Sequence, residues 1–142
     1  MTARTCLAVP ILIAIAGCAG RQDHAAAGDP AGAARSRVTT LLTQPLPADV
    51  GREGRVLTVE LPPGAATPPH RHDGAIFAYV AEGAVVSALD DGPEERFAVG
   101  QAWYEWPGQV HRVSRNASAT EPAKLVVFFL TEPGRPVLRP EK

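Results

Sequence analysis

Short apolar runs separated by turn residues fill the chain from Arg55 to Leu130, a pattern that predicts strands. In the first run, R-V-L-T-V-E-L, alternate positions are apolar, so Leu57, Val59 and Leu61 share one face. Further runs cover residues 75–81, 84–89, 96–99, 102–106, 109–114 and 124–130. The last run, K-L-V-V-F-F-L, is apolar almost throughout and predicts a buried strand. We expect roughly seven or eight short strands and no helix.

Turn signals lie between these runs. Glu82-Gly83 ends one run, Asp90-Asp91-Gly92-Pro93 supplies a tight connection, and Pro107-Gly108 separates two later runs. The whole chain has 14 prolines and 13 glycines, and punctuation of this kind is typical of antiparallel sandwiches and barrels. We therefore predict an all-β fold with a single antiparallel β-barrel. Inward-pointing side chains of a barrel meet in its interior even when they are far apart in sequence.

The N-terminal residues are typical of a targeting segment. The apolar run from Leu7 to Ala16 is shorter than the roughly 20 residues that span a membrane, and it predicts a signal peptide over residues 1–17. At its end, Ile15-Ala16-Gly17-Cys18 resembles the bacterial lipobox, which implies a lipid anchor at Cys18 in the cell envelope. Because Ala19 rather than an aspartate follows, we expect the periplasmic face of an outer membrane. The alternatives are an ordinarily cleaved secreted protein and an uncleaved anchor.

Two segments outside the strand region lack apolar periodicity. Residues 18–37 are rich in alanine and glycine and predict a flexible tether, in which His24 is a solvated linker histidine. The C-terminal residues 133–142 form a proline-rich tail without a pattern. The predicted barrel domain therefore covers residues 38–132, with regular structure ending near Leu130.

Cysteine content and net charge argue against a disulfide-stabilised domain and against a nucleic acid partner. Cys6 would leave with the signal peptide and Cys18 would carry lipid, so the predicted domain has no disulfide. The 45% hydrophobic content allows an apolar core to hold it instead. A formal net charge of −1 argues against a polyanion-binding surface, and we expect no nucleic acid partner.

Three of the four histidines could hold one metal ion. His70 and His72 are two residues apart, so in a strand both imidazoles leave one face and Arg71 leaves the other. His111 would meet them across the barrel, and three neutral imidazoles hold a divalent ion with open coordination positions. The alternatives are exposed loop histidines after Pro68-Pro69, and, at position 111, a barrel histidine bonded to a carbonyl.

The glycines around these histidines complete a known pattern. Gly64, His70, His72 and Gly83 stand at the spacings of the first cupin motif, and Gly100, Gly108 and His111 at those of the second. The chain thus resembles the cupins, which are jelly-roll β-barrels. The second motif's proline and asparagine are replaced by Trp106 and Arg115, with Pro107 and Asn116 one place later.

The resemblance implies a metal-binding barrel that takes a small organic molecule, such as a carboxylate or an enolisable carbonyl compound. If the protein is an enzyme, it implies metal-dependent chemistry of the oxygenase, isomerase or decarboxylase type. Candidate ions are Zn, Fe, Ni, Cu and Mn. A noncatalytic metabolite- or metal-binding sensor is the alternative, and a purely structural barrel is a third possibility.

Among the differences from the cupin motifs, Ile76 has the largest consequence for metal binding. It stands where the first motif has a glutamate that usually ligates the metal, and an isoleucine cannot do so. Glu105, six residues before His111, is the first candidate to replace it. We name Glu105 as the candidate catalytic residue, either as a ligand or as a base beside the metal. The alternative is a solvated or salt-bridged strand residue.

Aromatic residues surround this glutamate. Trp103 and Trp106 are three apart and would leave opposite faces of a regular strand, so one of them could line the barrel mouth as a wall for a planar substrate. Core packing is the alternative. Phe77 and Tyr79 alternate with Ile76 and should leave the opposite, outer face, where they could form a homodimer interface.

Overall fold

The computed structural model describes residues 35–48 and 50–142, which form eleven strands and no helix. The strands are β1 (Arg37–Pro45), β2 (Glu53–Leu61), β3 (Ala66–Thr67), β4 (His70–Arg71), β5 (Ala75–Glu82), β6 (Ala84–Leu89), β7 (Glu95–Ala98), β8 (Ala102–Glu105), β9 (Val110–Asn116), β10 (Ala123–Thr131) and β11 (Arg139–Pro140). This part of the chain therefore contains no helix long and apolar enough to cross a bilayer.

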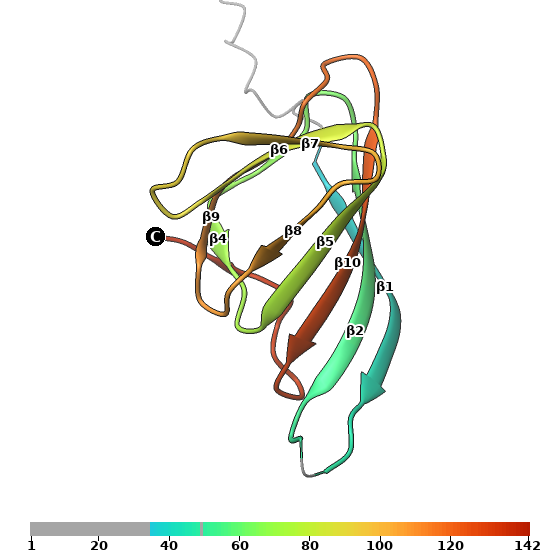
Figure 1. The fold of residues 1–142 in the computed structure, drawn as a ribbon, viewed down its shortest axis with the longest axis vertical. Helices are drawn as coiled ribbons and strands as arrows, with labels where there is room; N and C mark the ends of the chain where they lie inside the picture. The colour runs from blue at the N-terminus through green and yellow to red at the C-terminus, as the bar shows by residue number, and fades with distance from the viewer. Residues whose placement is uncertain (1–34, 49) are drawn as a thin grey trace, which may run out of the picture.

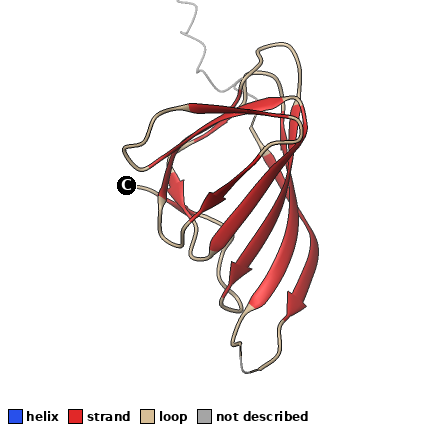
Figure 2. Cartoon of the chain, viewed as in Figure 1, coloured by secondary structure: helices blue, strands red, loops and turns tan. Residues whose placement is uncertain are grey.

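Two antiparallel sheets form the barrel (Figures 1 and 2). One sheet has the order β1-β2-β10-β5-β8, and the other has the order β11-β4-β9-β6-β7, with β3 paired to β9. From β4 to β10 the chain passes back and forth between the sheets, except for the β6-β7 hairpin within the second sheet, which is the connectivity of a jelly roll. The predicted all-β antiparallel barrel is confirmed. The predicted number of strands is too low, because the two-residue strands carry no periodic signal and the nine-residue β1 is exposed along its whole length, so it has no buried apolar face to give one.

Strand β10 shows how the core is built. Its side chains alternate, with Leu125, Val127 and Phe129 buried and Phe128 51% exposed. The prediction of a fully buried strand is therefore wrong for one face, because only the inner side of this sheet is covered by the other sheet. The buried apolar cluster comprises Leu57, Leu61, Ala65, Ile76, Ala78, Val80, Val85, Ala123, Leu125, Val127 and Phe129.

The outer face of the five-stranded sheet is also apolar. Phe77 and Tyr79 are 52% and 43% exposed, whereas Ile76 is only 2% exposed, as the alternation predicted. Cross-strand pairing aligns one outward residue from each strand in a row. The row runs Leu42, Val56, Phe128, Phe77 and Tyr104. The homodimer interface expected on this face stays a prediction.

The C-terminal residues join the barrel, although their sequence predicted no regular structure. β11 pairs with β4, aligning Arg139 with Arg71 and Pro140 with His70. The strand has only two residues, too few for any hydrophobic alternation, which explains why the sequence did not reveal it. The predicted tail is thus an edge strand of the sheet that carries the first histidine.

Two glycines are required by close backbone approach. A Cβ atom at Gly74, just before β5, would lie 2.2 Å from the carbonyl oxygen of Leu130. At Gly83, which has a φ of +67°, a Cβ atom would lie 2.4 Å from the carbonyl oxygen of Pro122. Because glycine has no Cβ atom, the two ends of β5 can lie close to the neighbouring backbone at Gly74 and Gly83. These close approaches fix the position of the strand that carries Ile76.

We expect Gly74→Ala to lower the free energy of unfolding by about 1–3 kcal/mol, because the added methyl group must displace backbone atoms. The matched control is Gly54→Ala in β2, where a Cβ atom meets nothing within 4 Å, and we expect a change within about 0.5 kcal/mol. Urea unfolding followed by circular dichroism measures both. Equal stability of the two variants would contradict the proposed close approach.

Candidate metal centre

The three predicted histidines meet inside the barrel. His70 on β4 lies directly opposite His111 on β9, and His72 follows two residues later. Their ring centroids are 4.9 Å apart for His70 and His72, and 5.0 Å apart for His70 and His111. One nitrogen from each ring lies within 4.8 Å of the others, and all three side chains are buried. The alternative of exposed loop histidines is therefore wrong.

Backbone carbonyl groups set the proton positions of two of the rings. His70 Nδ1 lies 2.8 Å from the carbonyl oxygen of Pro68, and His72 Nδ1 lies 2.6 Å from that of Val137. A carbonyl oxygen only accepts, so each Nδ1 donates its proton to it. Each Nε2 then carries a lone pair toward the cavity, which is the arrangement that a metal ligand requires.

His111 also contacts a side-chain hydroxyl group. Its Nε2 lies 2.9 Å from the hydroxyl oxygen of Ser87, and both residues are buried. Its Nδ1 lies 3.3 Å from Oε1 of Glu105. When the serine hydroxyl accepts the Nε2 proton, Nδ1 is left with a lone pair on the side of the other histidines. Ser87 is a site residue that was not predicted from the sequence, although a lone serine within the apolar run A-V-V-S-A-L is a signal.

Burial keeps the imidazoles neutral. It lowers the pKa of His111 to about 3, with a further contribution from the neighbouring His70 and His72. It also lowers the pKa of His72 to about 4, against the opposing effect of the bond to Val137, and it lowers the pKa of His70. All three rings are therefore neutral at neutral pH, with lone pairs free to bind a cation.

Glu105 lies beside the histidines and is only 2% exposed. Its Oε1 accepts a hydrogen bond of 2.9 Å from the indole N–H of Trp103. Its Oε2 lies 3.6 Å from Nε2 of His72 and has no hydrogen-bond partner. Burial raises the pKa of this carboxyl to about 7, although the Trp103 bond acts in the opposite direction. The alternative of a solvated strand residue is wrong.

The residues present fit a divalent ion. Two ligand atoms bound at about 2.1 Å in a tetrahedral site lie roughly 3.4 Å apart, so the nitrogens need to close by little more than about 1 Å from their present separations. A buried carboxylate oxygen without a partner is costly, and a cation at this point would satisfy it. The donor set of imidazole and carboxylate suits zinc, iron, nickel, copper or manganese.

The histidines face a small, mainly apolar cavity of about 70 Å³. Trp103 lines it, whereas Trp106 lies outside with 66% of its surface exposed, so the two tryptophans do leave opposite faces. The lining residues are Ser36, Val38, Leu57, Val59, Thr67, His70, His72, Ile76, Ala78, Trp103, Glu105, His111, Ser114, Leu125, Val127, Val137 and Leu138. This volume suits a molecule smaller than the usual occupant of a ligand pocket.

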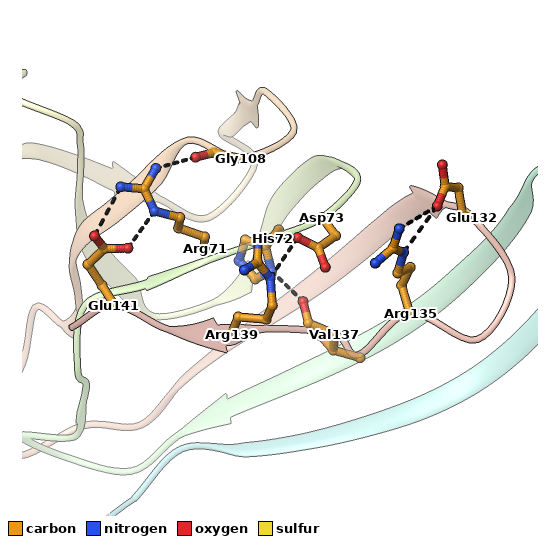
Figure 3. Close-up of polar contacts among 9 residues, drawn as sticks. All are labelled: Arg71, His72, Asp73, Gly108, Glu132, Arg135, Val137, Arg139 and Glu141. Carbon is orange, nitrogen blue, oxygen red and sulfur yellow. Dashed lines mark hydrogen bonds and ion pairs between the residues drawn. The ribbon is translucent and has the colours of Figure 1, made fainter.

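The C-terminal segment secures the histidine-bearing strand from outside, as Figure 3 shows. Val137 accepts the His72 hydrogen bond, and Arg139 Nε donates to Oδ1 of the adjacent Asp73 at 2.7 Å. Val137 and Leu138 also line the cavity, so this segment both orients the His72 ring and forms part of the cavity wall. This contribution could not be predicted from the sequence, because every residue has a backbone carbonyl group and residue type therefore carries no signal for it.

Arg71 connects the two histidine segments to this C-terminal segment (Figure 3). It points away from the histidines, as predicted, and forms an ion pair with Glu141. Its Nη1 also donates to the carbonyl oxygen of Gly108 at 2.6 Å, in the turn that leads to His111. The backbone N–H of Gly108 in turn donates to the carbonyl oxygen of His72 at 2.7 Å. These contacts hold the two segments in fixed relative positions.

The barrel and its three converging histidines define the chain as a small β-barrel protein with a candidate metal centre. A family model described as a cupin domain matches residues 57–129, half of the chain, and the chain belongs to the cupin family. The resemblance of the two histidine motifs to those of cupins is thereby confirmed. A comparison with curated protein sequences finds no match.

Solved structures share the fold. The DMSP lyase DddQ from Ruegeria pomeroyi is similar with a TM-score of 0.60 and 16% identity over 75% of this chain and 51% of that one. An uncharacterised Klebsiella pneumoniae protein with a double-stranded β-helix domain gives 0.58 and 22% over 76% and 86%. TT1209 from Thermus thermophilus gives 0.57 and 27% over 74% and 89%. The chain spans about half the length of the DMSP lyases that it matches.

We expect deletion of residues 137–142 to weaken zinc binding by about 10–100-fold, because His72 Nδ1 then loses the acceptor that fixes its proton. Chelator competition measures the affinity, and circular dichroism shows whether the barrel is retained. Arg135→Ala is the control, since it removes only an exposed ion pair with Glu132 in the same segment. Unchanged zinc affinity in a folded truncation would contradict the role of Val137.

Proposed function

We infer that this cupin binds one divalent metal ion through His70, His72 and His111 and presents it to a small organic molecule in the barrel cavity. The observation that carries this proposal is the orientation of the rings. His70 and His72 each direct an unprotonated Nε2 inward because a carbonyl group accepts the proton of Nδ1. One histidine bonded to a carbonyl group is an ordinary structural feature, but two such rings that direct their lone pairs toward a third buried imidazole form a set of metal donors.

A bound divalent ion would polarise a carbonyl or carboxylate oxygen of the substrate. The chain itself supplies the surroundings for that contact. Apolar walls from both sheets exclude water, and the indole of Trp103 offers a flat surface beside the histidines. Apart from Glu105 and the histidines, the lining carries no ionisable side chain among the described residues. The arrangement favours a small, largely apolar molecule with one chelating oxygen function.

Catalysis on such a molecule is the function that we propose, and a noncatalytic sensor remains the alternative. The likeness to DMSP lyases supports the fold only, because the identity is 16% for the Ruegeria protein. The substrate class proposed here therefore depends on the cavity and the donor set of this chain.

The proposal includes the cellular location. The signal peptide, Cys18 and residues 18–34 of the predicted tether lie outside the described residues, and the support for them is the sequence alone. The last tether residues, 35–37, are described, and Arg37 already begins β1. A lipid anchor at Cys18 would place the barrel at the periplasmic face of the outer membrane of a bacterial cell. The substrate would then be a small molecule of the cell envelope.

We expect the purified full-length protein to contain close to one equivalent of metal per chain, and His111→Ala to contain far less. Mass spectrometry of the elements identifies and counts the ion. The control is His24→Ala, which changes the histidine of the predicted tether and should leave the metal content intact. Substoichiometric metal that His111→Ala does not lower further would favour the structural barrel and overturn the metal proposal.

We expect cells fed radiolabelled palmitate to label the wild-type protein and not the Cys18→Ser variant, because the lipid is attached through that thiol. Cys6→Ser is the matched control and should keep the label, since Cys6 belongs to the predicted signal peptide. Labelling that persists in Cys18→Ser would show that the lipobox assignment is wrong.

A further inference from the structure

Glu105 stands opposite the position where the family motif has its glutamate. We propose that Glu105 is a protein ligand of the metal ion and replaces, from β8, the carboxylate that β5 lacks at Ile76. This inference rests on the proposed metal-binding function. It selects one of the two roles that the sequence left open for Glu105, that of a ligand over that of a base beside the metal.

The register of the sheet supplies the first argument. Ile76 and Glu105 are directly paired in the antiparallel ladder of β5 and β8. Paired residues have Cβ atoms about 4.5–5.5 Å apart and point to the same face of the sheet. Both side chains accordingly line the same cavity. A glutamate at position 76 or at position 105 reaches the same part of the cavity. A carboxylate that moves from β5 to the paired position on β8 can therefore still serve as a donor to the metal ion.

The distances supply the second argument. Glu105 Oε1 lies 3.3 Å from His111 Nδ1, and Oε2 lies 3.6 Å from His72 Nε2. Adjacent ligands of a six-coordinate ion with bonds of about 2.1 Å lie roughly 3.0 Å apart, so both distances are within about 0.6 Å of that spacing, and two positions stay open for the small molecule. The carboxylate therefore already stands at ligand spacing from two of the three histidines.

Charge balance supplies the third argument. Glu105 Oε2 is buried without a hydrogen-bond partner, while Trp103 satisfies only Oε1. The described residues that line the cavity include no lysine or arginine to compensate a carboxylate. Three neutral imidazoles would leave a divalent ion with its full charge, and one carboxylate reduces that charge by one. A bound ion would thus compensate the negative charge of Glu105, and Glu105 would compensate one positive charge of the ion, in a cavity whose apolar walls disfavour both charges.

The first test compares the zinc affinity of Glu105→Gln with that of the wild-type protein by chelator competition. A ligand role predicts a loss of at least about 100-fold, because glutamine keeps the shape but removes the negative charge. The matched control is Glu53→Gln, another buried glutamate, which pairs with Arg55 outside the cavity and should leave the affinity unchanged. Retained zinc affinity in Glu105→Gln would overturn the ligand role and favour the base.

A second test moves the carboxylate back to the motif position. The double variant Ile76→Glu with Glu105→Gln should recover most of the zinc affinity, whereas Ile76→Gln with Glu105→Gln should not. Circular dichroism establishes that both double variants are folded. Failure of the folded Ile76→Glu variant to recover affinity would contradict the exchange of the carboxylate between the two paired strands.

Thermal unfolding with and without zinc separates a ligand from a structural residue. For a ligand, Glu105→Gln should raise the melting temperature of the chelator-treated protein, because it removes an unpaired buried charge, and reduce the upward shift caused by zinc. A structural role predicts a lower melting temperature and an unchanged zinc shift. The His111→Ala variant distinguishes failure of the two proposals. If His111→Ala binds zinc as tightly as the wild-type protein, the proposed metal site is wrong. If His111→Ala loses zinc and Glu105→Gln keeps it, only the ligand role of Glu105 is wrong.

Discussion

The antiparallel pairing of β4 with β9 is the constraint on which the site depends. It places His70 opposite His111, although the two residues are far apart in the chain. β4 has only two residues and cannot hold this register by itself. β11 on its outer edge and Arg71, which bonds the turn before His111, secure it instead. The geometry of the candidate metal centre therefore depends on the edge of this sheet, where three separate segments meet.

Most of the fold and the three histidines could be predicted from the sequence. Strand alternation predicted which side of β5 faces the core, and the spacing of His70, His72 and His111 predicted a common site, because both are side-chain patterns with a fixed period. β11 and the acceptor at Val137 could not be predicted. A two-residue strand has no period, and a carbonyl group is present in every residue. Features that depend on the backbone alone leave no trace in residue type.

The same distinction explains the outcome at Glu105. The sequence identified Glu105 as a candidate because the motif glutamate is missing at Ile76 and Glu105 is the carboxylate six residues before His111. What the sequence could not reveal is the pairing of Glu105 with Ile76, since the register of β5 and β8 depends on the turn and the core around them. The fold and the types of donor residue could thus be predicted from the sequence. The residue paired with Ile76, where the motif glutamate is missing, could be identified only from the three-dimensional structure.

The proposed move of a ligand from β5 to β8 has a simple physical basis. A sequence motif assigns the carboxylate donor to a position on one strand. Metal binding depends only on where the carboxylate oxygen lies, whichever strand carries it. Positions 76 and 105 share one face and one cavity, so the isoleucine at one adds apolar wall while the glutamate at the other supplies charge. The loss of a motif residue therefore does not by itself imply the loss of the site, because a directly paired neighbour can carry the same donor into the same space.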